Sequence, residues 1–157
     1  YRALRRIWAG IMKDRFGADY LWDNSGNKFL ISNTDTKGGT KIQLAIANFN
    51  GGEYKNLGIP TFVSKCVWSK NNKLVYYALP NGLPSGAILP NDWQEGKSNS
   101  IDTFWKVDTS SGETSRIIEP KDLEDMKIDA VNLFFNDDES YLFFTNRIDG
   151  KLYRIAL

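Results

Sequence analysis

The stretch Asp19-Tyr-Leu-Trp-Asp-Asn-Ser-Gly-Asn-Lys-Phe-Leu-Ile-Ser32 has the pattern of two short strands joined by a polar turn. Tyr20 and Trp22 are spaced at the two-residue period of a β-strand, and the Asp23-Asn-Ser-Gly segment has the composition of a tight turn. Phe29-Leu-Ile then provides an apolar return strand. The stretch therefore predicts a β-hairpin.

Two later segments repeat this pattern. They are Lys65-Cys-Val-Trp-Ser-Lys-Asn-Asn-Lys-Leu-Val-Tyr-Tyr-Ala78 and Val131-Asn-Leu-Phe-Phe-Asn-Asp-Asp-Glu-Ser-Tyr-Leu-Phe-Phe-Thr145, where Phe134 takes the place of the tryptophan. Trp22 and Trp68 are 46 residues apart, close to the roughly 40–45 residues of a four-stranded repeat unit. Trp68 and Phe134 are 66 residues apart, and one insertion, residues 80–100, accounts for the excess.

Additional strand patterns follow each hairpin, for example Ile42-Gln-Leu-Ala-Ile-Ala and Phe104-Trp-Lys-Val-Asp. We therefore expect an all-β chain of about three four-stranded antiparallel sheets in one domain, 1–157. The expected units are 19–59, 64–118 with the insertion 80–100, and 128–157. Residues 1–18 fit either the outer strand of a preceding unit or a short amphipathic helix.

Composition excludes several classes of function. Lys and Arg total 20 against 19 Asp and Glu, so the net charge of +1 offers no broad field for nucleic acid. No apolar run approaches the roughly 18 residues of a membrane span. The single cysteine, Cys66, rules out an internal disulfide and is expected to be a buried thiol. The chain contains no histidine, so a Ser-His-Asp triad or a histidine-based zinc site cannot be completed within it. We expect no catalytic residues, no cofactor and no metal site.

The repeat resembles the TolB-like (WD40-like) repeat of bacterial β-propellers. In that family a strand ends in Trp-Ser, a polar turn and a lysine follow, and an apolar strand returns, as in Trp68-Ser-Lys-Asn-Asn-Lys-Leu. The companion motif of the third strand is matched by Phe104-Trp-Lys-Val-Asp-Thr-Ser-Ser-Gly-Glu113. The turn proline of the family is absent from all three copies. The chain is also similar to the C-terminal half of uncharacterised envelope proteins, some of which carry a PEGA domain.

The resemblance implies a partial propeller ring, with the remaining blades in a missing upstream segment. It implies a non-catalytic binding or scaffolding module for a protein or cell-wall ligand. The implied location is extracytoplasmic, at the bacterial cell envelope, with an anchor or signal upstream and no direct membrane insertion by this segment. The alternative is an accessory propeller of a larger peptidase or glycosidase whose catalytic residues lie outside this chain.

The insertion 80–100 is the predicted ligand-binding element, because long loops in compact domains are commonly functional. Its candidate binding residues are Asn91, Asp92, Trp93 and Gln94. Two alternatives remain open for Trp93. It is either an exposed anchor for a partner, or one of the apolar residues that fold the insertion back onto its sheet.

Overall fold

The computed structural model describes residues 19–34, 36, 38–50, 52–123 and 126–157. The expected strand or helix in residues 1–18 lies outside the described residues. The described chain is almost entirely β-structure, in three antiparallel sheets of four, four and three strands. The all-β expectation is therefore confirmed.

Each of the first two sheets is a meander in which consecutive strands pair. The first sheet has the order β1(Asp19–Trp22), β2(Lys28–Thr34), β3(Ile42–Asn48) and β4(Lys55–Ile59). The second has the order β5(Cys66–Trp68), β6(Leu74–Asn81), β7(Ile101–Asp108) and β8(Thr114–Arg116).

The third sheet has three strands, β9(Ala130–Phe135), β10(Tyr141–Asn146) and β11(Leu152–Ala156). Short helices interrupt the strands: η1(Val63–Lys65) and η2(Pro120–Leu123) between sheets, and α2(Asn91–Gln94) within the insertion. η2 is the short helical turn between the second and third sheets.

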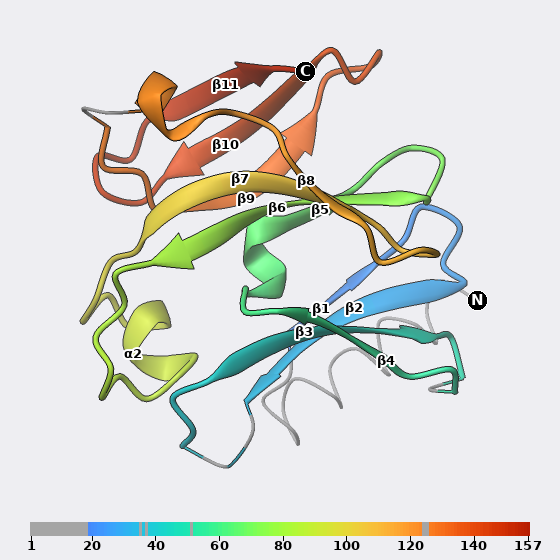
Figure 1. Cartoon of the computed structure of the whole chain (residues 1–157), viewed down its shortest axis with the longest axis horizontal. Coiled ribbons are helices and arrows are strands. Elements are labelled where there is room, and N and C mark those ends of the chain that lie inside the picture. The colour runs from blue at the N-terminus through green and yellow to red at the C-terminus, as the bar shows by residue number, and fades with distance from the viewer. Residues whose placement is uncertain (1–18, 35, 37, 51, 124–125) are drawn as a thin grey trace.

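The three sheets lie side by side, with the second between the other two (Figure 1). One apolar cluster, which includes Leu30 and Trp68, joins the first sheet to the second. Another, which includes Phe104 and Phe144, joins the second to the third. Along β10 buried and half-buried side chains alternate, because successive side chains of a strand point to opposite faces of the sheet.

The hairpin turns show which residues correspond among the sheets. The backbone N–H groups of Asp23, Ser69 and Asn136 each donate to the carbonyl oxygen five residues later. The residue before each turn is therefore Trp22, Trp68 or Phe135. The assignment of Phe134 to the tryptophan position was wrong by one residue, and a one-residue shift in a strand moves a side chain to the opposite face. Phe134 is accordingly 46% exposed.

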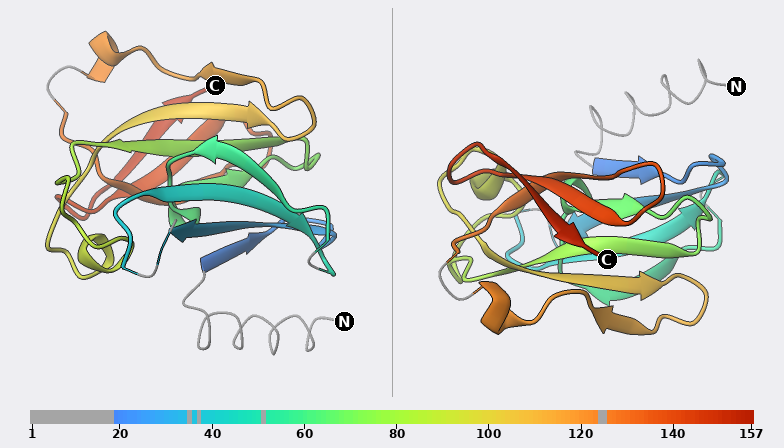
Figure 2. Two further views of the ribbon diagram at one scale, coloured as in Figure 1. Left: turned by 60° about the horizontal axis from the view of Figure 1, so that its bottom comes forward. Right: turned by 90° about the horizontal axis from the view of Figure 1, so that it is seen from above.

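The tight turns and the longer connections lie at opposite ends of the sheets. The turns after β1, β5 and β7 are at the right in Figure 1, whereas the insertion with α2 is at the left. Figure 2 shows the same separation from two other sides. The insertion and the linkers that precede β5 and β9 therefore form one end of the molecule, which we call the linker face.

Candidate functional site

The insertion is fixed to the first sheet as well as to its own. Pro80 and Asn81 belong to β6, so the connection outside the strands runs from 82 to 100. Within it Ala87, Leu89 and Trp93 are buried in a cluster with Ile42 of β3 and Phe62. The backbone N–H of Leu89 also donates to the carbonyl oxygen of Gly39, at 3.0 Å. This connection is therefore a packed element and not a free loop.

Trp93 is 3% exposed and lies at the centre of this packing. Its indole ring stacks on Phe62, with ring centroids 4.2 Å apart and planes at 10°. Its Nε1 donates to both carboxylate oxygens of Asp129, at 3.1 Å each, and the guanidinium carbon of Arg147 lies 4.3 Å from the ring centroid. Of the two alternatives for Trp93, the structure shows the one in which it folds the insertion back onto the sheet. The exposed-anchor alternative was wrong, because an indole N–H and ring with these partners have no surface left for a ligand.

The other three candidate binding residues lie further out on α2. Asn91 and Gln94 are exposed, and Gln94 Nε2 donates to Asp19 of β1 at 3.1 Å. Asp92 accepts the backbone N–H of Ile88 at 2.7 Å and contacts the Lys97 ammonium at 3.1 Å. The Ile88 N–H, followed by Lys97, lowers the pKa of Asp92. Ligand binding by Asn91, Asp92 and Gln94 stays a prediction.

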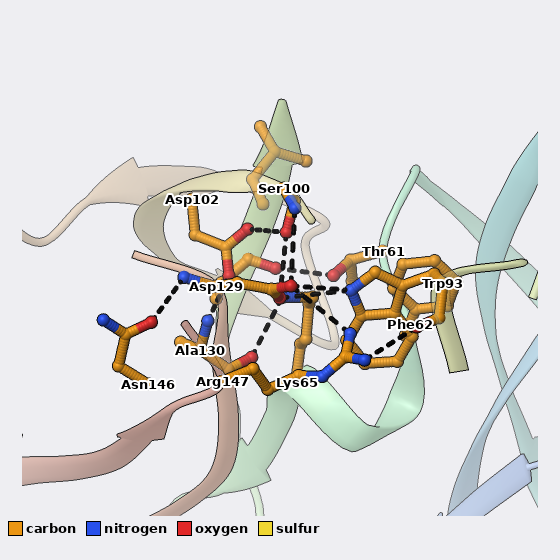
Figure 3. Close-up of polar contacts among 12 residues, drawn as sticks. Thr61, Phe62, Lys65, Trp93, Ser100, Asp102, Asp129, Ala130, Asn146 and Arg147 are labelled. Carbon is orange, nitrogen blue, oxygen red and sulfur yellow. Dashed lines mark hydrogen bonds and ion pairs between the residues drawn. The ribbon is translucent and has the colours of Figure 1, made fainter. Parts of the chain in front are cut away.

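Beneath α2 lies a buried ionic network centred on Lys65 (Figure 3). Its Nζ contacts Asp102 Oδ2 and Asp129 Oδ1, each at 2.6 Å, and the side chains of all three residues are 0% exposed. A third hydrogen bond runs from Nζ to the carbonyl oxygen of Ala130, at 3.0 Å. An ammonium has three donors, and all three are used.

The two carboxylates are satisfied by the surrounding chain. Asp102 accepts the Ala130 N–H at 2.7 Å and the Ser100 hydroxyl at 2.6 Å. Asp129 also accepts the Arg147 guanidinium at 3.3 Å. Two cations and two carboxylates balance in charge, which is the condition for ions to persist in a dry interior. Such a saturated network holds separate parts of the chain together.

The network connects segments from every part of the linker face. Lys65 ends the linker before β5, Asp102 lies at the start of β7, and Asp129 precedes β9. Sequence reasoning missed the network because its lysine is 37 and 64 residues from the two aspartates. The sequence contains only a weak indication of this network. It is a lysine next to the apolar strand 66–68 and an aspartate within the strand 101–108.

Burial sets the protonation of the groups near this network. It raises the pKa of the Asp102 carboxyl, an effect that the Lys65 ammonium opposes. Burial also raises the pKa of the Cys66 thiol far above its ordinary value. Cys66 is 5% exposed, as expected for a structural thiol, and it is therefore protonated at neutral pH.

An open cavity of about 350 Å³ lies between the insertion and the first sheet. Its walls mix apolar and polar surface in similar amounts and include three prolines, and its polar groups come from the β2–β3 connection, from β3 and from the insertion. The lining residues are Thr40, Lys41, Ile42, Gln43, Gly58, Pro60, Pro80, Leu83, Pro84, Ser85 and Leu89. The cavity is therefore built by the insertion together with the neighbouring sheet, on the linker face.

The described residues lack two features, a metal-binding cluster and a membrane-spanning helix. They contain no group of three or more His, Cys, Asp or Glu side chains that could hold a metal ion. None of the helices in this part of the chain is both long and apolar enough to cross a membrane.

No protein-family model and no curated protein matches the sequence. Solved structures do match in three dimensions. A protein of Agrobacterium tumefaciens assigned as TolB is similar with a TM-score of 0.56 and 15% identity, over 88% of this chain and 42% of that one. TolB from Acinetobacter baumannii has a TM-score of 0.58 and 14% identity, over 89% and 30%. An oligogalacturonate lyase in complex with manganese has a TM-score of 0.52 and 15% identity, over 88% and 34%.

At these identities the similarity concerns the fold. This chain spans less than half the length of the solved structures that it matches. Its sheets of four, four and three strands superpose on parts of propeller proteins, so each sheet is a blade. The chain therefore has the fold of a TolB-like β-propeller, and its described residues form three consecutive blades.

Proposed function

We propose that this chain is the ligand-recognition part of a non-catalytic β-propeller at a bacterial cell envelope. It binds a protein or cell-wall ligand through the linker face. The observation that carries the proposal is the cavity of about 350 Å³, which exists because the insertion is packed against the neighbouring blade. Concave, largely preformed, apolar sites with a few polar groups are the usual form of ligand sites.

The rigidity of the insertion supports a binding role. A loop that binds while disordered loses affinity to the ordering of its residues, whereas a loop already packed in position does not. Leu83, which lines the cavity, packs against the buried cluster of Leu89 and Trp93, so this wall of the cavity is held in place by the core. Lys41, the one charged residue of the lining, favours a ligand with an acidic or carbonyl group.

Site-specific photocrosslinking in the envelope of the producing bacterium tests this proposal. A photoreactive residue replaces Ser85, which is exposed at the cavity. A matched variant carries it at Ser111, also an exposed serine, in the turn after β7 at the opposite end of the blades. We expect crosslinks to one protein or to peptidoglycan fragments from position 85 and none from position 111. Equal crosslinking at both positions, or none at 85, would contradict the proposal.

Cell fractionation and protease digestion test the proposed location at the cell envelope. We expect the full-length protein to fractionate with the periplasm or envelope and to be digested by protease added to spheroplasts. Recovery in the protease-resistant cytoplasmic fraction would contradict the envelope assignment, whatever the crosslinking shows.

A further inference from the structure

The cavity on the linker face contains the cation of Lys41. This lysine is exposed, and no ion pair joins its ammonium to another residue of the described chain. No Asp or Glu is among the described residues that line the cavity. An ammonium offers three donors and no acceptor, and its strongest hydrogen bonds are to anions. The charge of Lys41 is therefore available to an anionic group of a ligand.

Gln43, also in the lining, has its amide orientation fixed by two hydrogen bonds of the first blade. Asn56 Oδ1 accepts the backbone N–H of Gly58 at 2.8 Å, so the other polar atom of this amide, Nδ2, is a donor. Asn56 Nδ2 in turn donates to Gln43 Oε1. The Gln43 oxygen is thereby occupied, and its Nε2, which forms no hydrogen bond among the described residues, is left as a donor at the cavity.

A β-bulge in the first blade builds this arrangement. The pairing of β3 with β4 shifts register between Leu44 and Ala45, and Gly58 falls within the resulting bulge. Gly58 has a φ of 68°, which a residue without a Cβ adopts readily, and it forms part of the cavity wall. The bulge therefore supplies the backbone N–H that orients Asn56, and through it the donor of Gln43.

The apolar part of the lining is aliphatic. It consists of Ile42, Leu83, Leu89 and three prolines, and no aromatic side chain is among the described residues of the lining. Flat ligands such as nucleobases are held by stacking on aromatic side chains, which these walls do not provide. The cavity of about 350 Å³ is at the small end of the range for ligand pockets. It therefore suits a short aliphatic group beside an anion.

We propose that this cavity binds the carboxyl terminus of a peptide that ends in an aliphatic residue. Lys41 pairs with the carboxylate, Gln43 Nε2 donates a hydrogen bond to it, and the aliphatic walls accept the last side chain. Asn56 is a positioning residue, because it keeps the Gln43 oxygen turned away from the ligand. This ligand class rests on the proposed binding role of the linker face.

Calorimetric titration of the full-length protein with three short peptides tests the proposal. They are N-acetylated dialanyl-leucine as the free acid, the same peptide as its C-terminal amide, and a matched acid that ends in D-alanine. The free acid is expected to bind at least about tenfold more tightly than the amide, because only the carboxylate forms a charge-assisted pair with the ammonium. Tighter binding of the D-alanine peptide would support a cell-wall stem peptide as the source, and tighter binding of the leucine peptide a protein.

Three variants assign the recognition to its residues. Lys41→Met is expected to weaken the acid at least about tenfold and to leave the amide unchanged. Lys73→Met, at an exposed lysine in the turn after β5 at the opposite end of the blades, is expected to change neither. Asn56→Ala introduces no charge and releases the Gln43 amide, so the preference for acid over amide is expected to fall by about threefold. A merely structural role of Asn56 would weaken both peptides alike.

Three results would overturn the carboxyl-terminal ligand. They are equal affinities for acid and amide, acid binding that survives Lys41→Met, and no binding of any peptide up to about 10 mM. If crosslinks from Ser85 to a partner persist alongside such a result, the linker-face proposal stands and only the ligand class is wrong. If the acid binds selectively while Ser85 gives no crosslink in the cell, the ligand class stands and the proposed role fails.

Discussion

Lys65 and Lys97 show how burial decides what an ion pair contributes. Each ammonium contacts two carboxylates, Asp102 and Asp129 for Lys65, and Asp92 and Glu95 for Lys97. The Lys65 side chain is 0% exposed and that of Lys97 is 63% exposed. The two lysines therefore form a natural matched pair.

Lys65→Met is expected to reduce the free energy of unfolding by about 3–5 kcal/mol, because it leaves the buried Asp102 without a cation and Asp129 with Arg147 alone. Lys97→Met removes solvent-screened pairs and is expected to change the free energy of unfolding only slightly. Urea denaturation of both variants measures the difference. We call Lys65, Asp102 and Asp129 the buried clamp. Similar losses of unfolding free energy for the two lysine variants would contradict a stabilising role of this clamp.

The Cys66 thiol provides a second test at this scale. Because burial raises its pKa, the folded protein keeps the thiol protonated and is expected to react with a disulfide reagent at pH 8 at least about 100-fold more slowly than the unfolded chain. A raised folded pKa stabilises the fold fully below the pKa of a free thiol, about 8.5, and that contribution is lost as the pH rises above it. Rapid labelling of the native protein at pH 8 would contradict the buried position.

At the scale of elements, the insertion is the part whose behaviour departs most from a sequence-based expectation. Its length indicated a functional loop, but periodicity cannot show which side of such a segment is buried. Trp93 packs on Phe62, 31 residues earlier in the chain, and hydrogen-bonds Asp129, 36 residues later. Contacts at those separations depend on how blades are placed and leave no local pattern.

Trp93→Ala is expected to lower the free energy of unfolding by about 3–5 kcal/mol, because it removes a buried ring and one of the hydrogen-bond donors to the Asp129 carboxylate. Gln94→Ala, at the exposed neighbouring position, is expected to change it by less than about 0.5 kcal/mol. Chemical denaturation followed by tyrosine and tryptophan fluorescence measures both. A Trp93→Ala protein as stable as the unmodified chain would contradict the role of Trp93 in packing the insertion.

The hairpins could be predicted because their determinants are local. Alternating apolar residues and a polar turn lie within about fourteen residues of each other, so the first two hairpins were identified at their correct positions. The third was displaced by one residue because Phe134 and Phe135 are both aromatic, and only the turn hydrogen bond of Asn136 distinguishes them. Side-chain direction in a strand is decided by pairing, which a run of adjacent aromatics does not reveal.

On the scale of the whole molecule, three blades leave apolar surface and backbone groups that a closed ring would cover. The 157-residue chain is therefore expected to self-associate as its concentration rises, through Phe134 and Phe143 on the outer face of the third blade and through the outer edge of β11. Light scattering after size-exclusion chromatography from about 5 to 200 μM measures this. Phe143→Glu is expected to reduce the association and Phe49→Glu to leave it unchanged, whereas a chain that stays monomeric throughout would argue against an incomplete ring.

The buried clamp under α2 has a consequence for how such a protein can diversify. Lys65, Asp102 and Asp129 keep the blades and the base of the insertion in register, while Lys41, Pro84 and Ser85 are exposed and contribute nothing to that clamp. Substitutions around the cavity can then accumulate in a lineage without disturbing the frame that supports them. Ligand preference and foldability are thereby separated within one chain, so descendants can acquire new specificities while retaining the same three blades.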